Sequence, residues 1–136
     1  MRESTGGGAR VLLTGAAGRM GRTLRKPLAE SFDTVRLFAR RPISPLDPGE
    51  ELAIGDLSEA AAVASACEGV DVIVHLGGKA DEASFDEILG ANIIGTYHIF
   101  EAARRSGVRR VVYASSHHVT GFYPVDHLTT VEQPVR

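Results

Sequence analysis

The sequence contains a single cysteine, no tryptophan and few aromatic residues, which make up 6% of its 136 positions. One thiol, that of Cys67, excludes an internal disulfide and a metal site built from several thiolates. No apolar run approaches the roughly 20 residues that a membrane-spanning helix needs. These absences favour a protein of the reducing cytoplasm that is not anchored in a membrane by a helix and that holds no thiolate-bound metal.

An excess of either charge is also missing, since 15 Lys and Arg face 17 Asp and Glu, for a formal net charge of -2. The arginines are scattered along the chain, so there is no basic field to attract nucleic acid. With 43% hydrophobic residues, the chain is long enough to bury one core. We expect a flexible lead-in over residues 1–9 and one domain over residues 10–136.

Apolar runs and helix-forming stretches alternate along the chain. Strands are predicted at residues 10–14, 34–39, 51–56, 70–76 and 109–116, and helices at 20–31, 58–67 and 84–106. Pro27 should kink the first helix or reset its start, and Gly107 should end the third helix. This alternation predicts an α/β fold of three layers, a doubly wound Rossmann-type parallel sheet of five strands in the order 3-2-1-4-5.

The first strand runs into a glycine-rich turn, "TGAAGRMG". In a dinucleotide-binding turn, Gly15 permits the tight bend, Gly18 lets the backbone approach a pyrophosphate, and Gly21 lets the helix pack on the strand. The unpaired N–H groups of the helix start then attract phosphate. The alternative is that any tight turn from strand to helix favours glycine.

The end of the second strand reads Ala39, Arg40, Arg41, where many NAD-binding proteins have a carboxylate for the adenosine ribose. Two guanidinium groups suit a 2′-phosphate, so this position favours NADP over NAD. The alternative is an exposed basic turn next to Pro42.

Four positions, Gly15, Arg40, Asp56 and Gly77, lie at the carboxyl ends of predicted strands, where a doubly wound sheet binds its ligand, so we expect them to converge.

Two further strand ends carry polar residues. Asp56 and Leu57 lie where an adenine would bind, although Asp56 or Ser58 alternatively caps the next helix. His75 ends the fourth strand and is interpreted as a buried, hydrogen-bonded histidine in preference to a catalyst. Lys79 follows it, either facing an anionic ligand or lying in solvent.

Five stretches, "TGAAGRMG", "GDL", "VIVHLGG", "NIIGT" and "VVYASSHHVTGFYP", resemble the extended short-chain dehydrogenases, also called the NAD-dependent epimerase/dehydratase family, and within it the uronate dehydrogenases. The resemblance implies an oxidoreductase that transfers hydride from C1 of a sugar acid to NAD or NADP. Together with Arg40, the implied cofactor contacts are Gly15, Ala17, Gly18, Arg19, Met20, Gly21, Asp56, Leu57, Leu76, Gly77, Gly78 and Asn92.

The resemblance also assigns roles around the substrate. Ser116 matches the catalytic serine, which donates a hydrogen bond to the substrate oxygen. Lys79, His117 and His118 would line the sugar pocket, and Asn92 would order a water and kink its helix.

The chain departs from the family's pattern in several places. Arg40 stands where NAD-using uronate dehydrogenases have aspartate, and Ala80 replaces a small polar residue. None of the three tyrosines has the lysine four residues later that completes the family's acid/base pair, so we expect the chain to stop before the substrate region and to be nearly inert alone. A non-catalytic dinucleotide-binding module and a fragment of a nucleotide-sugar epimerase or dehydratase are the alternatives.

The edge of the fifth strand should be open and apolar, covered by a second copy or by another partner.

Overall fold

The computed structural model describes residues 8–134, so most of the predicted lead-in, residues 1–7, lies outside the described residues. Within this range the strands are β1 (Arg10–Thr14), β2 (Thr34–Ala39), β3 (Glu50–Ile54), β4 (Val72–His75) and β5 (Arg110–Tyr113). The helices are α1 (Arg19–Ala29), α2 (Ala60–Cys67), α3 (Phe85–Ile88), the π-helical segment η1 (Leu89–Ile94), α4 (Gly95–Ser106) and the 3-10 helix η2 (His117–Thr120).

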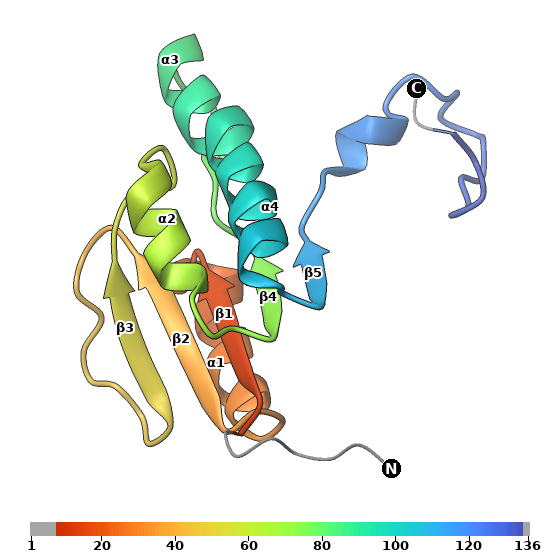
Figure 1. Ribbon diagram of the computed structural model, residues 1–136. Coiled ribbons are helices and arrows are strands. Elements are labelled where there is room, and N and C mark those ends of the chain that lie inside the picture. Colours follow the sequence, from red (N-terminus) through yellow and green to blue (C-terminus); the bar gives the residue numbers. More distant parts are fainter. Residues whose placement is uncertain (1–7, 135–136) are drawn as a thin grey trace.

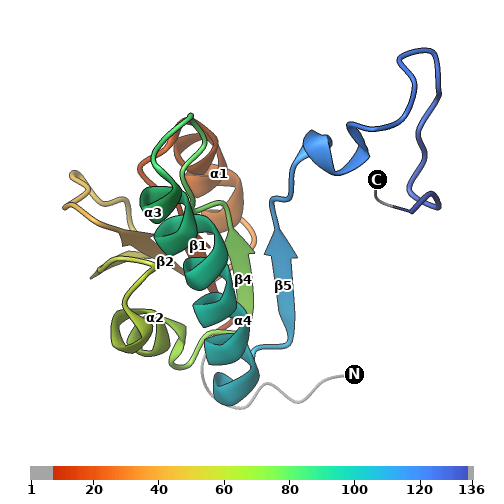
Figure 2. The same cartoon turned by 90° about the horizontal axis from the view of Figure 1, so that it is seen from above.

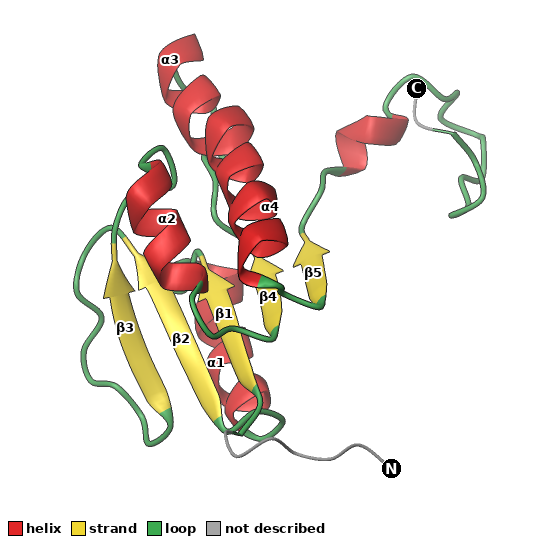
Figure 3. Ribbon diagram, viewed as in Figure 1, coloured by secondary structure: helices red, strands yellow, loops and turns green. Residues whose placement is uncertain are grey.

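The strands form one parallel sheet in the order β3-β2-β1-β4-β5, which confirms the predicted topology. Helix α1 covers one face of the sheet, and α2 and α4 cover the other (Figures 1 and 3). The sheet is therefore the middle of three layers. Its parallel strands all end at the same edge, where a doubly wound fold binds its ligand.

Side chains of successive strand residues enter two cores on opposite faces. Val11 and Leu13 of β1 belong to the core beneath α1, whereas Leu12 between them belongs to the core beneath α2 and α4. All three side chains are fully buried. Because both faces of β1 are covered, its sequence is a continuous apolar run, as expected for an internal strand of a parallel sheet.

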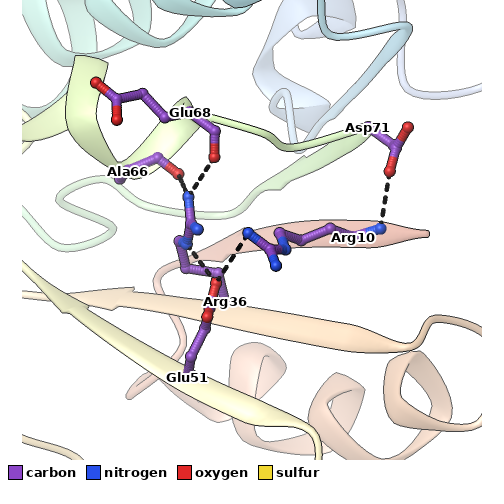
Figure 4. Close-up of polar contacts among 6 residues, drawn as sticks. All are labelled: Arg10, Arg36, Glu51, Ala66, Glu68 and Asp71. Carbon is purple, nitrogen blue, oxygen red and sulfur yellow. Dashed lines mark hydrogen bonds and ion pairs between the residues drawn. The ribbon is translucent and has the colours of Figure 1, made fainter. Parts of the chain in front are cut away.

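An arginine on β2 forms hydrogen bonds that connect β2 with β3 and with the end of α2 (Figure 4). From β2, Arg36 donates through Nε to Glu51 of β3 at 2.7 Å, and through Nη1 to the carbonyl oxygens of Ala66 at 2.7 Å and Glu68 at 2.8 Å. Those carbonyls belong to the end of α2, where backbone acceptors lack helical partners. Arg10 of β1 approaches the same Glu51 carboxylate at 4.0 Å.

The predicted first helix is present, and Pro27 does not reset its start, because α1 runs from Arg19 to Ala29 with Pro27 in its last turn. Proline has no N–H to donate to the carbonyl oxygen four residues earlier, and the helix ends two residues after it. The predicted continuous α-helix over residues 84–106 is wrong over Leu89–Ile94, which is π-helical. Gly107 ends α4 in the left-handed conformation, as predicted.

The side of the molecule formed by the outer strand β5 and the neighbouring helix carries exposed apolar side chains, as predicted for this edge. They are Phe85, Ile93, Tyr97, Phe100, Val112 and Tyr113. After β5 the chain leads away from the sheet and the helices (Figures 1 and 2). The segment 114–134 therefore leaves this side uncovered.

Candidate functional site

A cleft of about 810 Å³ lies at the carboxyl ends of the strands. Its lining comes from the turns after β1, β2, β3, β4 and β5 and from the start of the long helical segment, which consists of α3, η1 and α4 (residues 85–106). Four positions predicted from strand ends, Gly15, Arg40, Asp56 and Gly77, meet here. The lining also includes the predicted contacts Ala17, Gly18, Arg19, Met20, Gly21, Leu57, Leu76, Gly78 and Lys79.

The three glycines of the first turn differ in what constrains them. Gly15 adopts φ +68°, and a Cβ there would lie 2.9 Å from the backbone nitrogen of Gly77. At Gly21 a Cβ would lie 2.3 Å from the carbonyl oxygen of Gly15, so any side chain would separate α1 from β1. Gly18 is less restricted, since its Cβ would meet only that same oxygen at 3.2 Å. The fold thus requires Gly15 and Gly21 and leaves Gly18 free for ligand contact.

The amino end of α1 is open to an anion. Its N-cap, Gly18, makes no side-chain capping hydrogen bond, and within residues 8–134 its first turn holds no acidic residue. By contrast, Ser84 and Glu87 form a complete capping box at α3. Unpaired amides and the positive end of the helix dipole therefore face the cleft at α1, which fits a pyrophosphate.

Arg40 and Asp56 mark the end of the cleft beside β2 and β3. Arg40 is exposed and lines the cleft, whereas Arg41 does not contribute to the lining. Asp56 Oδ1 accepts hydrogen bonds from the backbone N of Ser58 at 2.9 Å and from its hydroxyl at 2.8 Å. These bonds, and the charge of Arg40, lower the pKa of Asp56 and keep it ionised.

Neither predicted cap, Asp56 or Ser58, directly caps α2, because its N-cap is Glu59. The hydrogen bonds between Asp56 and Ser58 instead form a turn, and α2 begins after this turn at Ala60. Leu57 is almost fully buried against the core, and the side chain of His98 contacts its carbonyl oxygen through Nδ1 at 2.9 Å.

Beneath the β4 end of the cleft lies a buried polar group. His75 is fully buried, as predicted, and its Nδ1 lies 2.6 Å from the hydroxyl of Thr14. The same hydroxyl accepts a hydrogen bond from the backbone N of Gly77 at 3.0 Å. On the other side of the ring, Nε2 lies 3.4 Å from the hydroxyl of Thr96, and Tyr113 stacks on the ring at 5.5 Å. Desolvation lowers the pKa of His75 to about 4.

Asn92 shapes the cleft without lining it. Its Oδ1 accepts from the backbone N of Lys79 at 2.6 Å, and its Nδ2 donates to the Lys79 carbonyl at 2.9 Å. Asn92 belongs to the π-helical segment, which lies where the family resemblance expects a distorted helix. Because π-helical winding adds a residue to a turn, it changes where a side chain points.

Of the proposed substrate residues, Lys79 lines the cleft, whereas Ser116, His117 and His118 do not. Ser116 is the N-cap of η2, with its hydroxyl 3.0 Å from Nδ1 of His118, and the rings of His117 and His118 lie 4.1 Å apart. Ala114, two residues before Ser116, does line the cleft. Ser116, His117 and His118 therefore come shortly after the cleft-lining Ala114 in the sequence without lining the cleft themselves.

Several lining residues were not predicted as contacts. They are Phe38, Ala39, Gly55, Ser58, Ala80, Asp86, Glu87, Gly90, Ala91 and Ala114. Those next to strand ends follow from the rule that also identified Arg40 and Asp56, namely that a doubly wound sheet binds its ligand at the carboxyl ends of its strands. Asp86, Glu87, Gly90 and Ala91 carry no sequence signal, because their place depends on where the long helical segment starts relative to the sheet.

The fold and the cleft define a doubly wound α/β protein with a glycine-rich turn at its first crossover. Residues 11–136 match the NAD dependent epimerase/dehydratase family, and the chain belongs to that family.

Three similar proteins are named as uronate or glucuronic acid dehydrogenases. Over 128 residues, 93% of this chain, the sequence is 46% identical to uronate dehydrogenase from Pseudomonas putida, 48% of whose length is covered. A mutant of uronate dehydrogenase from Agrobacterium tumefaciens complexed with NAD superposes with a TM-score of 0.88 at 44% identity, covering 94% of this chain and 48% of that one. For glucuronic acid dehydrogenase from Chromohalobacter salexigens the TM-score is 0.89 at 40% identity, with 96% and 49% covered. The chain thus spans about half the length of these relatives.

Proposed function

We propose that this chain is the dinucleotide-binding part of an oxidoreductase that oxidises a sugar acid at C1. The observation that carries the proposal is the cleft, in which an uncapped helix start and the ends of β1 and β4 converge. The similarity to uronate dehydrogenases supports the sugar acid as substrate, and the NAD-bound relative supports the cofactor.

The residues of the cleft fit a nicotinamide dinucleotide. The amides at the start of α1 would hold the pyrophosphate, while the β2–β3 side would take the adenosine and the β4 side the nicotinamide. When bound, the nicotinamide accepts the hydride from C1. Ser116 would donate a hydrogen bond to the substrate oxygen, with Lys79, His117 and His118 on the sugar. The proton of the oxidised hydroxyl needs a base, and within residues 1–136 no tyrosine has the family's lysine partner.

For the choice of cofactor, we propose that NADP binds more tightly than NAD. Arg40 lines the cleft at the end of β2, where no carboxylate occupies the ribose position, and Arg41 follows it. One charged hydrogen bond at a partly exposed site contributes about 1.5 kcal/mol, or roughly tenfold in affinity. Arg40→Asp should reverse the preference, with Arg22→Asp, outside the cleft, as the matched control.

A second candidate function is a dinucleotide-binding module without catalysis, which needs only the cleft and the uncapped helix start. Titration calorimetry with NAD and with NADP tests the premise that both candidates share. Activity on glucuronate and galacturonate then separates them, measured for this chain and for the chain extended by its downstream coding sequence. Dinucleotide binding with activity only in the extended chain supports the oxidoreductase; binding without activity in either supports the module. Absence of binding contradicts both.

We also propose that the exposed apolar side of β5 and α4 is covered in the cell by a second copy or by another polypeptide segment. The exposed rings of Tyr97 and Phe100 and the half-exposed Val112 support this, because such a side favours association. Sedimentation of wild type against Tyr97→Lys tests the second copy, with a monomer in both cases ruling it out and leaving another polypeptide segment as the cover. Cytoplasmic location remains a proposal; within residues 8–134 the helices are too short or too polar to cross a membrane.

A further inference from the structure

We propose that His75 is a positioning residue, a neutral imidazole protonated on Nε2 that fixes the floor of the nicotinamide half of the cleft through the hydroxyl of Thr14. The proposal rests on the proposed function only for the identity of the ligand. The hydrogen-bond arrangement itself is a property of the chain.

The contacts form a continuous chain from α4 to the cleft. Thr96 on α4 lies next to Nε2 of His75, Nδ1 of His75 lies next to Thr14, and Thr14 binds the backbone N–H of Gly77. Gly77 lines the cleft, while Thr14 and His75 are both fully buried. Water therefore does not compete for the hydrogen bond between Thr14 and His75, and the hydrogens of these two side chains need partners in the protein.

Counting hydrogens assigns the tautomer. The Thr14 oxygen accepts from Gly77 N–H and has one hydrogen of its own to donate. If Nδ1 of His75 carried a proton, the Thr14 hydrogen would be left without an acceptor among the described residues. If Nδ1 is bare, it accepts from Thr14 at 2.6 Å, and the Nε2 proton is directed at Thr96. The second arrangement uses the hydrogens of both fully buried side chains, His75 and Thr14, and leaves unassigned that of the Thr96 hydroxyl, which is only half-buried and within reach of water.

The arrangement matters for the ligand because two backbone turns meet at this point. A Cβ added to Gly15 would lie 2.9 Å from the backbone N of Gly77, so the turns after β1 and β4 already touch. Thr14 ends β1 and holds the turn after β4. His75 orients the Thr14 hydroxyl, so that its lone pair faces Gly77. The adenosine half of the cleft, around Arg40 and Asp56, is built from other strands.

Two substitutions separate this role from a general packing role. His75→Phe keeps an aromatic ring beside Tyr113 but has no acceptor for Thr14, whereas His75→Asn offers a side-chain oxygen near the position of Nδ1. His98→Gln is the matched comparison, because His98 contacts Leu57 on the adenosine side. Binding of NAD and of AMP to each folded variant is measured by calorimetry.

We expect His75→Phe to weaken NAD binding about tenfold, the effect of one hydrogen bond, and to leave AMP binding unchanged. His75→Asn should recover at least part of the loss. His98→Gln should weaken NAD and AMP equally. An equal loss of both ligands in His75→Phe, or no recovery in His75→Asn, overturns the positioning role.

A second measurement stays informative if the protein binds no dinucleotide or if His75→Phe fails to fold. A two-bond proton–nitrogen NMR spectrum of the wild-type imidazoles should show His75 protonated on Nε2 and bare on Nδ1 at neutral pH. Protonation of Nδ1 would refute the inference. If the tautomer is the expected one and wild type binds neither NAD nor NADP, the proposed function fails while the hydrogen-bond assignment stands.

Discussion

Replacing Arg36 by methionine should destabilise the fold strongly without touching the cleft. Methionine keeps an apolar stem of similar length but removes all three donors to Glu51, Ala66 and Glu68. The Arg36 side chain is 14% exposed and Ala66 is buried, so water replaces these bonds only in part. An unpaired buried acceptor costs about 1–3 kcal/mol. Counting Ala66 in full and the bonds to the more exposed Glu51 and Glu68 at about 0.5 kcal/mol each gives about 2–4 kcal/mol.

The assay is urea unfolding at neutral pH, supported by a thermal melt, in which this loss corresponds to roughly 6–16 °C for a domain of this size. Arg105→Met is the control, because Arg105 also pairs with a carboxylate, that of Glu101, but at a surface where its side chain is 72% exposed. The control should melt like wild type. If Arg36→Met also melts like wild type, the contacts in Figure 4 do not stabilise the end of α2 and the reasoning is refuted.

Three further predictions concern the buried groups and the glycine turn. Burial lowers the pKa of His75 from 6.5 to about 4, so between these pH values the unfolded chain binds a proton that the native protein does not. The free energy of unfolding should therefore fall by up to about 1.4 kcal/mol per pH unit on acidification. An equal slope in His75→Phe would contradict this. Gly21→Ala should lose about 1–3 kcal/mol in urea unfolding through its contact with the Gly15 backbone. Gly18→Ala, whose Cβ would lie 3.2 Å from the same backbone oxygen, should lose less stability yet bind NAD more weakly; equal losses would show that the two glycines do not differ. The thiol of Cys67, fully buried and with its pKa raised to about 11, should react with an aromatic disulfide reagent only after unfolding in urea, and rapid reaction in the native protein would show that the core opens.

The sheet was predictable because each strand and the first turn are marked by residues that lie close together in the sequence. Apolar runs such as Val11–Leu13 mark internal strands, and the glycine turn at the first crossover determines where the strand order reverses. The strand-end rule then placed Arg40, Asp56 and Gly77 in one cleft from sequence alone.

The long helical segment was not fully predictable, because contacts between distant residues determine it. The segment 89–94 is π-helical, Asn92 within it binds the backbone of Lys79, and Gly95 lies so close to Leu57 that an added Cβ would be 2.7 Å from it. Helical periodicity alone carries no sign of these contacts. The place of Ser116 relative to the cleft likewise depends on segments after β5 that have no strong periodic pattern.

The proposed function requires that the uncapped start of α1 holds the pyrophosphate of a nicotinamide dinucleotide and that the turn after β4 holds its nicotinamide half. Its most direct test is a proton–nitrogen NMR titration of the labelled protein with NAD and NADP. The account predicts that the amide signals of Gly18, Arg19 and Gly77 shift together and saturate, while those of Gly107 and Gly121 stay in place. Shifts confined to other residues, or no shift at millimolar dinucleotide, would contradict it.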